Sequence, residues 1–188
     1  YHVLFQRLNS MGEPQWADNG MVVSNNANAS WIAVYHLNLA VDSEDNAIIT
    51  TMDQRAGGAW EVYAYKIASN GTMLWGNDGV SLTSSSVSNM SPRLTVLPDN
   101  SVVVTWTHND DTVLFQRISS DGTLLWDTGI LIEDDDATLI SPEPIVTNDG
   151  NVLIQWIRQT GPFWASNSEL YLLKYNYDGI TEWSNPIV

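Results

Sequence analysis

Two segments of the chain combine aromatic rings with a guanidinium group, a combination suited to binding. The first segment contains Arg55 and Trp60, and the second contains Arg158, Phe163 and Trp164. An exposed tryptophan stacks on a sugar ring or anchors a protein partner, and an arginine pairs with carboxylates. These five residues form our candidate ligand site, for a neutral or acidic glycan or for an acidic loop of a protein. The alternative interpretation is that the rings only cap the hydrophobic ends of the fold.

Catalytic and metal chemistry have little support elsewhere in the chain. His2, His36 and His108 are not spaced as metal ligands, and the serines at 84–86 have no nearby histidine or other base. The acidic run 133–136 offers oxygen ligands for Ca²⁺ but lacks the Asp-x-Asp-x-Asp-Gly spacing, so we interpret it as a solvated loop. We therefore predict no catalytic residues, no metal and no cofactor, and we favour a protein that is not an enzyme.

The composition indicates an exported protein. The 188 residues include no cysteine and carry a formal net charge of −15, with Lys66 and Lys174 as the only lysines. An acidic surface repels phosphate backbones, which argues against nucleic acid as a partner. No apolar stretch approaches the roughly 20 residues of a membrane span. The abundance of Asn, Ser, Thr and Asp beside so few lysines predicts an extracellular, cell-surface or periplasmic location.

A repeat organises the chain. A glycine is followed four residues later by a tryptophan at four places, and these tryptophans recur at spacings of 59, 51 and 57 residues. The pairs are Gly12/Trp16, Gly71/Trp75, Gly122/Trp126 and Gly179/Trp183. Recurrence at this length indicates a repeat architecture. We predict that the four tryptophans, together with Trp106 and Trp156, pack between repeats and bind no ligand.

Each repeat predicts two β-hairpins. Asn70-Gly71, Asp121-Gly122 and Asp178-Gly179 are turn signals between strand-like segments, and a second hairpin precedes each of them. Four antiparallel strands in about 50 residues predict one blade of an all-β propeller. The predicted full blades are 36–83, 93–133 and 142–185, with a half blade at 1–24, which gives about three and a half blades. We therefore expect either a part of a longer propeller or self-association, with two chains completing a ring of about seven blades.

A resemblance supports this interpretation. The stretch VLFQRISSDGTLLWDTG, followed by SPEPIVTNDGNVLIQW, resembles repeats of secreted and cell-surface proteins of Bacteroidetes, and the Gly-to-Trp spacing is similar to that of quinoprotein-type propellers. The matching positions include Gln116-Arg117, Ser91-Pro92 and Ser141-Pro142. The resemblance implies a secreted protein but no particular activity, because propellers carry many unrelated functions.

The repeat also places the candidate ligand site. Trp31, Trp60 and Trp164 break the tryptophan pattern, and the last two fall in loops 54–61 and 157–169, each linking the second strand of a blade to its third. These loops emerge on one face of a propeller, so we expect the candidate residues to converge there. The function we favour is a non-catalytic binding or scaffold module with protein–protein or adhesive contacts. The alternatives are carbohydrate binding and a fragment of a propeller glycosidase or lyase.

Overall fold

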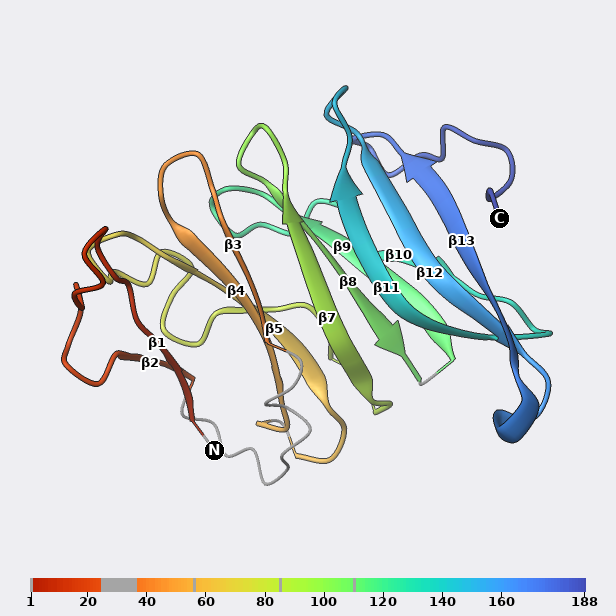
Figure 1. The fold of residues 1–188 in the computed structure, drawn as a ribbon, viewed down its shortest axis with the longest axis horizontal. Coiled ribbons are helices and arrows are strands. Elements are labelled where there is room, and N and C mark those ends of the chain that lie inside the picture. Colours follow the sequence, from red (N-terminus) through yellow and green to blue (C-terminus); the bar gives the residue numbers. More distant parts are fainter. Residues whose placement is uncertain (1, 25–36, 56, 85, 110) are drawn as a thin grey trace.

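The computed structural model describes residues 2–24, 37–55, 57–84, 86–109 and 111–188. The fold is all-β and contains four antiparallel sheets that stand in a row (Figure 1). Trp31 and His36 lie outside the described residues, as does most of the link between the first two sheets. No helix in the described ranges is long and apolar enough to cross a membrane.

Each sheet takes its strands in chain order. The first contains β1 (Val3–Phe5) and β2 (Met21–Ser24). The second contains β3 (Asn38–Val41), β4 (Ala47–Asp53), β5 (Glu61–Ile67) and β6 (Val80–Ser81). The third contains β7 (Asn89–Val96), β8 (Val102–His108), β9 (Thr112–Ile118) and β10 (Ile130–Ile132). The fourth contains β11 (Thr138–Val146), β12 (Val152–Thr160) and β13 (Asn167–Tyr175).

The predicted hairpin turns are present. Gly71, Gly122 and Gly179 have φ angles of 87°, 96° and 78°, a region that other residues seldom adopt. The hairpin at Gly71 is closed by a backbone hydrogen bond from its amide to the Ala68 carbonyl, and the Asn70 side chain accepts from the Thr72 amide. The turn chemistry read from the sequence therefore fixes these hairpins.

The inner strands of the third and fourth sheets begin four residues before the predicted blade boundaries. β7 and β11 each contain a Ser-Pro pair, at which the register with the next strand shifts. Ser91 and Ser141 have positive φ angles of 57° and 53°, the left-handed conformation that one type of β-bulge uses. The bulge accommodates a proline that cannot donate to the ladder, so each strand continues through it.

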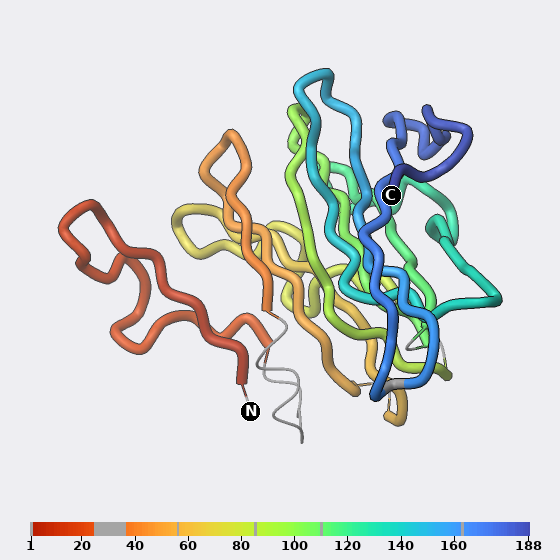
Figure 2. Tube along the Cα trace, turned by 45° about the vertical axis from the view of Figure 1, so that its right-hand side comes forward, coloured from red at the N-terminus to blue at the C-terminus, as the bar shows by residue number. Residues whose placement is uncertain are grey.

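The fourth sheet has three strands rather than the four predicted. In place of a fourth strand, a single bridge pairs Leu172 with Ile187 through two backbone hydrogen bonds of 2.9 Å. The segment 176–188 and the first hairpin lie at opposite ends of the row, as the turned view in Figure 2 also shows.

The core lies between the sheets. β7 packs against β3, β4 and β5, and β11 packs against β7, β8 and β9. Three apolar clusters fill the successive junctions and contain the repeating tryptophans, of which Trp75, Trp106, Trp126 and Trp156 are buried. Trp16 and Trp183 are partly buried at the two ends. The positions of Trp16, Trp75, Trp106, Trp126 and Trp156 agree with the prediction that the rings pack between repeats, whereas Trp183 lies at the end of the row.

Candidate functional site

The repeating tryptophans join each sheet to the next through the same hydrogen bond. The indole Nε1 of Trp16 donates to the carbonyl of Ser69, and Trp75 donates to Ser120, each over 3.1 Å. Trp126 repeats the contact with the Tyr177 carbonyl, also over 3.1 Å. Every acceptor lies two residues before the glycine of the next hairpin, so the tryptophan of one repeat docks on the following repeat.

The docked indole, in addition to the positive φ of the turn, explains why glycine occupies these positions. A Cβ at Gly122 would lie 2.9 Å from Cδ1 of Trp75, and a Cβ at Gly179 would lie 3.1 Å from Nε1 of Trp126. A side chain at either position would therefore displace the indole. The sequence pattern pairs glycine and tryptophan within one hairpin, but the contact joins successive hairpins.

A basic residue on the third strand of each full sheet strengthens the junction. Lys66 pairs with Asp42 at 2.9 Å, and both side chains are buried. Arg117 pairs with Asp99 at 2.6 Å. Lys66 and Arg117 also donate to the carbonyls of Ser120 and Tyr177, at 3.2 and 2.7 Å, and these carbonyls are the tryptophan acceptors.

The aspartates of these pairs are held in their ionised form. Burial opposes ionisation of Asp42, but hydrogen bonds from Asn46 and Lys66 outweigh it and lower its pKa. Asp99 has a lowered pKa for the same reason, because bonds from Ser101 and Arg117 exceed the cost of burial. The pairs are therefore charge-assisted contacts that connect the turn between the first two strands to the third strand.

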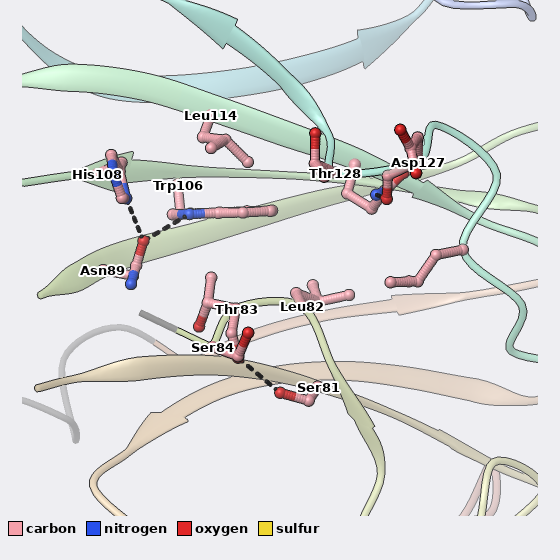
Figure 3. A pocket seen from close by; sticks show the side chains of 12 residues that line it. Ser81, Leu82, Thr83, Ser84, Asn89, Trp106, His108, Leu114, Asp127 and Thr128 are labelled. Atoms are coloured by element: carbon pink, nitrogen blue, oxygen red, sulfur yellow. Dashed lines mark hydrogen bonds between the residues drawn. The ribbon is translucent and has the colours of Figure 1, made fainter. Parts of the chain in front are cut away.

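A hollow of about 460 Å³ opens between the second and third sheets (Figure 3). One wall is the segment around Leu82 and Thr83, and the other carries Asn89, Trp106 and His108. In Figure 3 the Asn89 side chain points toward both rings. Its Oδ1 lies 3.0 Å from Nε1 of Trp106 and 2.8 Å from Nδ1 of His108.

The Asn89 side chain in this hollow is engaged in holding the fold. Asn89 donates through Nδ2 to the carbonyls of Trp60 and Val87, so its Oδ1 is the acceptor for both rings. His108 must then carry its proton on Nδ1. Trp106 is 0% exposed and offers no face for stacking. The cluster thus fixes β7 and β8 to the loop before β5.

Sequence reasoning missed this cluster, although a signal existed. Aligned on the Ser-Pro pairs, Asn89 stands where the next repeat has Leu139, and both are buried. A polar residue in a buried repeat position needs a partner. Here that partner set includes His108, which stands where the next repeat has Arg158.

Arg55, the first predicted site residue, is engaged within its own sheet. Its guanidinium donates to Asp53 and to the Tyr65 hydroxyl, each at 2.6 Å, and lies 3.5 Å from the ring centre of Tyr63. Burial opposes its charge, but Asp53 and Tyr65 outweigh burial and raise its pKa. Burial, together with a hydrogen bond to Glu61, raises the pKa of Tyr63 to about 12. Arg55 therefore stabilises the end of its sheet.

Trp60 and Arg158 also have structural partners. Trp60 is half-buried, and its carbonyl accepts from the Asn89 amide at 2.9 Å. Arg158 on β12 donates from Nε to Asp134 at 2.7 Å, and this hydrogen bond lowers the pKa of Asp134. The predicted acidic loop is therefore anchored to β12. Among the described residues, no group of three or more acidic, histidine or cysteine side chains could hold a metal ion.

Trp164 differs from Arg55, Trp60 and Arg158 because it is 85% exposed, and the side chain of Phe163 lies outside the described part of the structure. It lies in the short helix η2 (Phe163–Ala165), within the loop between β12 and β13. The link between β12 and β13 covers residues 161–166, so the predicted loop 157–169 was too long because both strands extend into it. This link and the link between β4 and β5 lie at the same end of the sheets, with the third sheet between them (Figure 1). The contacts described for Arg55 stay in the second sheet, and those of Arg158 stay in the last sheet and the acidic loop. Convergence of the five residues therefore remains a prediction.

No protein-family model matches the chain, and no curated protein matches it either. The case for function consequently rests on the geometry of the described residues. Two features carry that case: the docking contact repeated between sheets, and the exposed indole of Trp164.

Proposed function

We propose that the chain is a segment of a β-propeller that serves as a non-catalytic binding module in a protein–protein or adhesive contact. Support for the propeller comes from the second and third sheets, each of four antiparallel strands in chain order, and from the aromatic junctions between sheets. In this proposal the first sheet is the half blade. The acidic composition and the absence of cysteine support an extracellular, surface or periplasmic setting for it.

The observation that carries the binding proposal is the exposure of Trp164. The ring of Trp164 is 85% exposed, so a partner that covers it makes binding more favourable by removing apolar surface from water. Tryptophan is also enriched among the residues that dominate binding. Trp164 sits on the loop 161–166 between two regular strands, and loops held by a rigid scaffold are where binding residues concentrate. Arg55, Trp60 and Arg158 are engaged in the fold, so we assign them to positioning the two loops.

Carbohydrate recognition is a second candidate, favoured by the neighbours of Trp164. Ser166 and Asn167 are exposed beside it, and hydroxyl and amide groups hydrogen-bond sugar hydroxyls while an indole stacks on the ring. This pattern suits a neutral glycan better than an acidic one, because the surrounding surface is acidic.

The test compares the full chain with Trp164→Ala and Trp164→Phe on a glycan array and on a panel of immobilised extracellular proteins. We expect binding that Trp164→Ala abolishes and Trp164→Phe partly retains. Binding to glycans alone would favour the second candidate. A ligand that Trp164→Ala binds with unchanged affinity would place the site elsewhere and overturn the assignment.

A further inference from the structure

One position on the third strand of a sheet differs between the repeats. It lies eight residues before the hairpin glycine and is Tyr63 in the second sheet, Leu114 in the third and Tyr171 in the fourth. Each of these side chains packs in the junction with the preceding sheet. Two of the three junctions therefore hold a phenol ring at this position, and the junction between the second and third sheets does not.

Both tyrosines lie beside an arginine that is paired with an aspartate. The Arg55 guanidinium lies 3.5 Å from the ring centre of Tyr63 and pairs with an aspartate of its own sheet at 2.6 Å. The Arg158 guanidinium lies 6.0 Å from the ring centre of Tyr171, and its Nε donates to Asp134 at 2.7 Å. A ring and an ion pair thus occupy these two junctions together.

The junction between the second and third sheets has smaller side chains at the equivalent positions. Leu114 replaces the tyrosine, and His108 stands where the next repeat has Arg158. Ser84 stands where the next repeat has Asp134, because each follows a repeat glycine by five residues. Leu114, His108 and Ser84 all line the hollow of about 460 Å³. The hollow therefore lies where the next junction holds a phenol ring and an ion pair.

His108 gives this hollow a hydrogen-bond acceptor of fixed position. Its Nδ1 donates to the Asn89 side chain over 2.8 Å, and Asn89 is 0% exposed. A neutral imidazole that carries its proton on Nδ1 has an acceptor lone pair on Nε2. Among the described residues, Nε2 of His108 has no hydrogen-bond partner. The next repeat has Leu139 in place of Asn89, so the residue that orients the imidazole belongs to the repeat with the hollow.

The remaining lining suits an apolar ring without negative charge. Leu82 lies on one wall and Leu114 on the other, and Leu124 also lines the hollow (Figure 3). Apolar walls favour an apolar ligand over water, and a few placed polar groups orient it. Asp127 at the hollow and the net charge of −15 disfavour an anion.

We propose that this hollow is a binding site for a small neutral aromatic alcohol. The ring of the ligand packs between the leucines, and its hydroxyl donates to Nε2 of His108. The ligand is a phenol because the chain itself places a phenol ring at the equivalent position of the next junction. Both walls belong to the second and third sheets, so the described residues form the whole site. The proposal goes beyond the binding role of Trp164 and does not depend on it.

The first experiment is a titration of the full chain with 4-methylphenol, followed by ¹H–¹⁵N nuclear magnetic resonance. The indole N–H of Trp106 is the reporter, because its partner is the Asn89 oxygen that also accepts from His108. We expect a saturable shift of this signal. Toluene is the matched probe without a hydroxyl and should bind at least about tenfold more weakly, because it leaves Nε2 unpaired.

The second experiment fills the hollow or removes its acceptor. Leu114→Tyr introduces the ring that the neighbouring sheets carry at this position, so it should fold and lose 4-methylphenol binding. Leu114→Ile is the matched control of equal volume and should keep it. His108→Phe keeps a flat ring without the acceptor, so 4-methylphenol should bind it only as weakly as toluene does. Trp164→Ala should bind both probes unchanged, which separates this site from the proposed binding loop.

Four results would overturn the proposal. The unmodified chain could show no saturable shift with 4-methylphenol, or it could bind toluene equally well. Leu114→Tyr, shown to be folded by circular dichroism, could bind 4-methylphenol with unchanged affinity. His108→Phe could do the same, and this variant decides the matter if Leu114→Tyr does not fold.

Discussion

At the scale of single residues, Trp126 and Trp164 differ in what surrounds the ring. Trp126 is 8% exposed, meets Phe115 edge-on with ring centres 5.7 Å apart, and donates its Nε1 proton to the next hairpin. Trp164 has its ring in solvent. The same residue type therefore stabilises the fold at one position and is available to a partner at the other.

We predict that Trp126→Ala and Trp164→Ala differ strongly in stability. Truncating Trp126 removes buried area and leaves a cavity, so the free energy of unfolding should fall by about 3–5 kcal/mol. Truncating Trp164 should change it by about 0.5 kcal/mol or less, as for other exposed positions. Urea unfolding monitored by far-UV circular dichroism measures both. Equal losses would mean that the two roles are misassigned.

A second residue-scale prediction concerns the buried pair of Asp42 and Lys66. Asp42→Ala leaves the Lys66 ammonium buried without its counter-ion, which should cost about 3–5 kcal/mol. The double substitution Asp42→Leu/Lys66→Met should cost less than the single one, because no buried charge remains. Urea unfolding again measures both, and a double variant less stable than Asp42→Ala would contradict this account.

The pH dependence of stability supplies the control for that pair. The pKa of Asp42 is lower in the fold than its ordinary value of 3.8, so its contribution is fully present above that value. The contribution is lost as the pH falls through the lowered pKa. In Asp42→Ala the decline of stability below about pH 4 should therefore be shallower than in the unmodified chain.

At the scale of elements, the sequence predicted the hairpins well and the strand starts less well. Asn70-Gly71 and Asp121-Gly122 determine their turns through local backbone conformation, which a sequence shows directly. A Ser-Pro pair reads as the edge of a strand because proline cannot donate to the ladder, and only the bulge in β7 and β11 shows how the strand continues. Local rules therefore located the turns and missed an irregularity that depends on pairing.

The candidate site was predictable only in part for a related reason. Trp60 and Trp164 both break the tryptophan repeat, but only Trp164 is largely exposed, whereas Trp60 is half-buried. Asp53, one partner of Arg55, is close to it in sequence, but the Tyr65 hydroxyl comes from the neighbouring strand β5. The Asn89 cluster joins β7 and β8 to a loop of the second sheet. Contacts between distant segments are not written in residue type or spacing, so the structure was needed to find them.

The bulge in β11 gives a prediction at this scale. Ser141 is exposed and has a φ of 53°, so a substitution there tests backbone conformation with little effect on packing. Ser141→Val should lower the free energy of unfolding by about 1–2 kcal/mol, because a β-branched residue is strained at positive φ. Ser141→Asn is the matched control and should stay close to the unmodified chain. An unchanged free energy of unfolding in Ser141→Val would contradict the strain argument.

At the scale of the whole molecule, stability follows from one repeated interface. The same indole-to-carbonyl contact joins the first sheet to the second, the second to the third and the third to the fourth. Loss of one contact should therefore weaken one junction between neighbouring sheets and leave the equivalent contacts in place. The ring of about seven blades expected from three and a half blades stays a prediction.

The net charge of −15 opposes the self-association expected from the repeats, and that opposition can be measured. Raising the salt from about 0.01 to 0.1 M shortens the screening length from about 30 to 10 Å. Apolar contacts lose little by this screening, whereas the repulsion between two acidic copies weakens. Self-association should therefore strengthen with salt when sedimentation velocity is carried out at both concentrations. Dissociation on adding salt would mean that ion pairs hold the copies together.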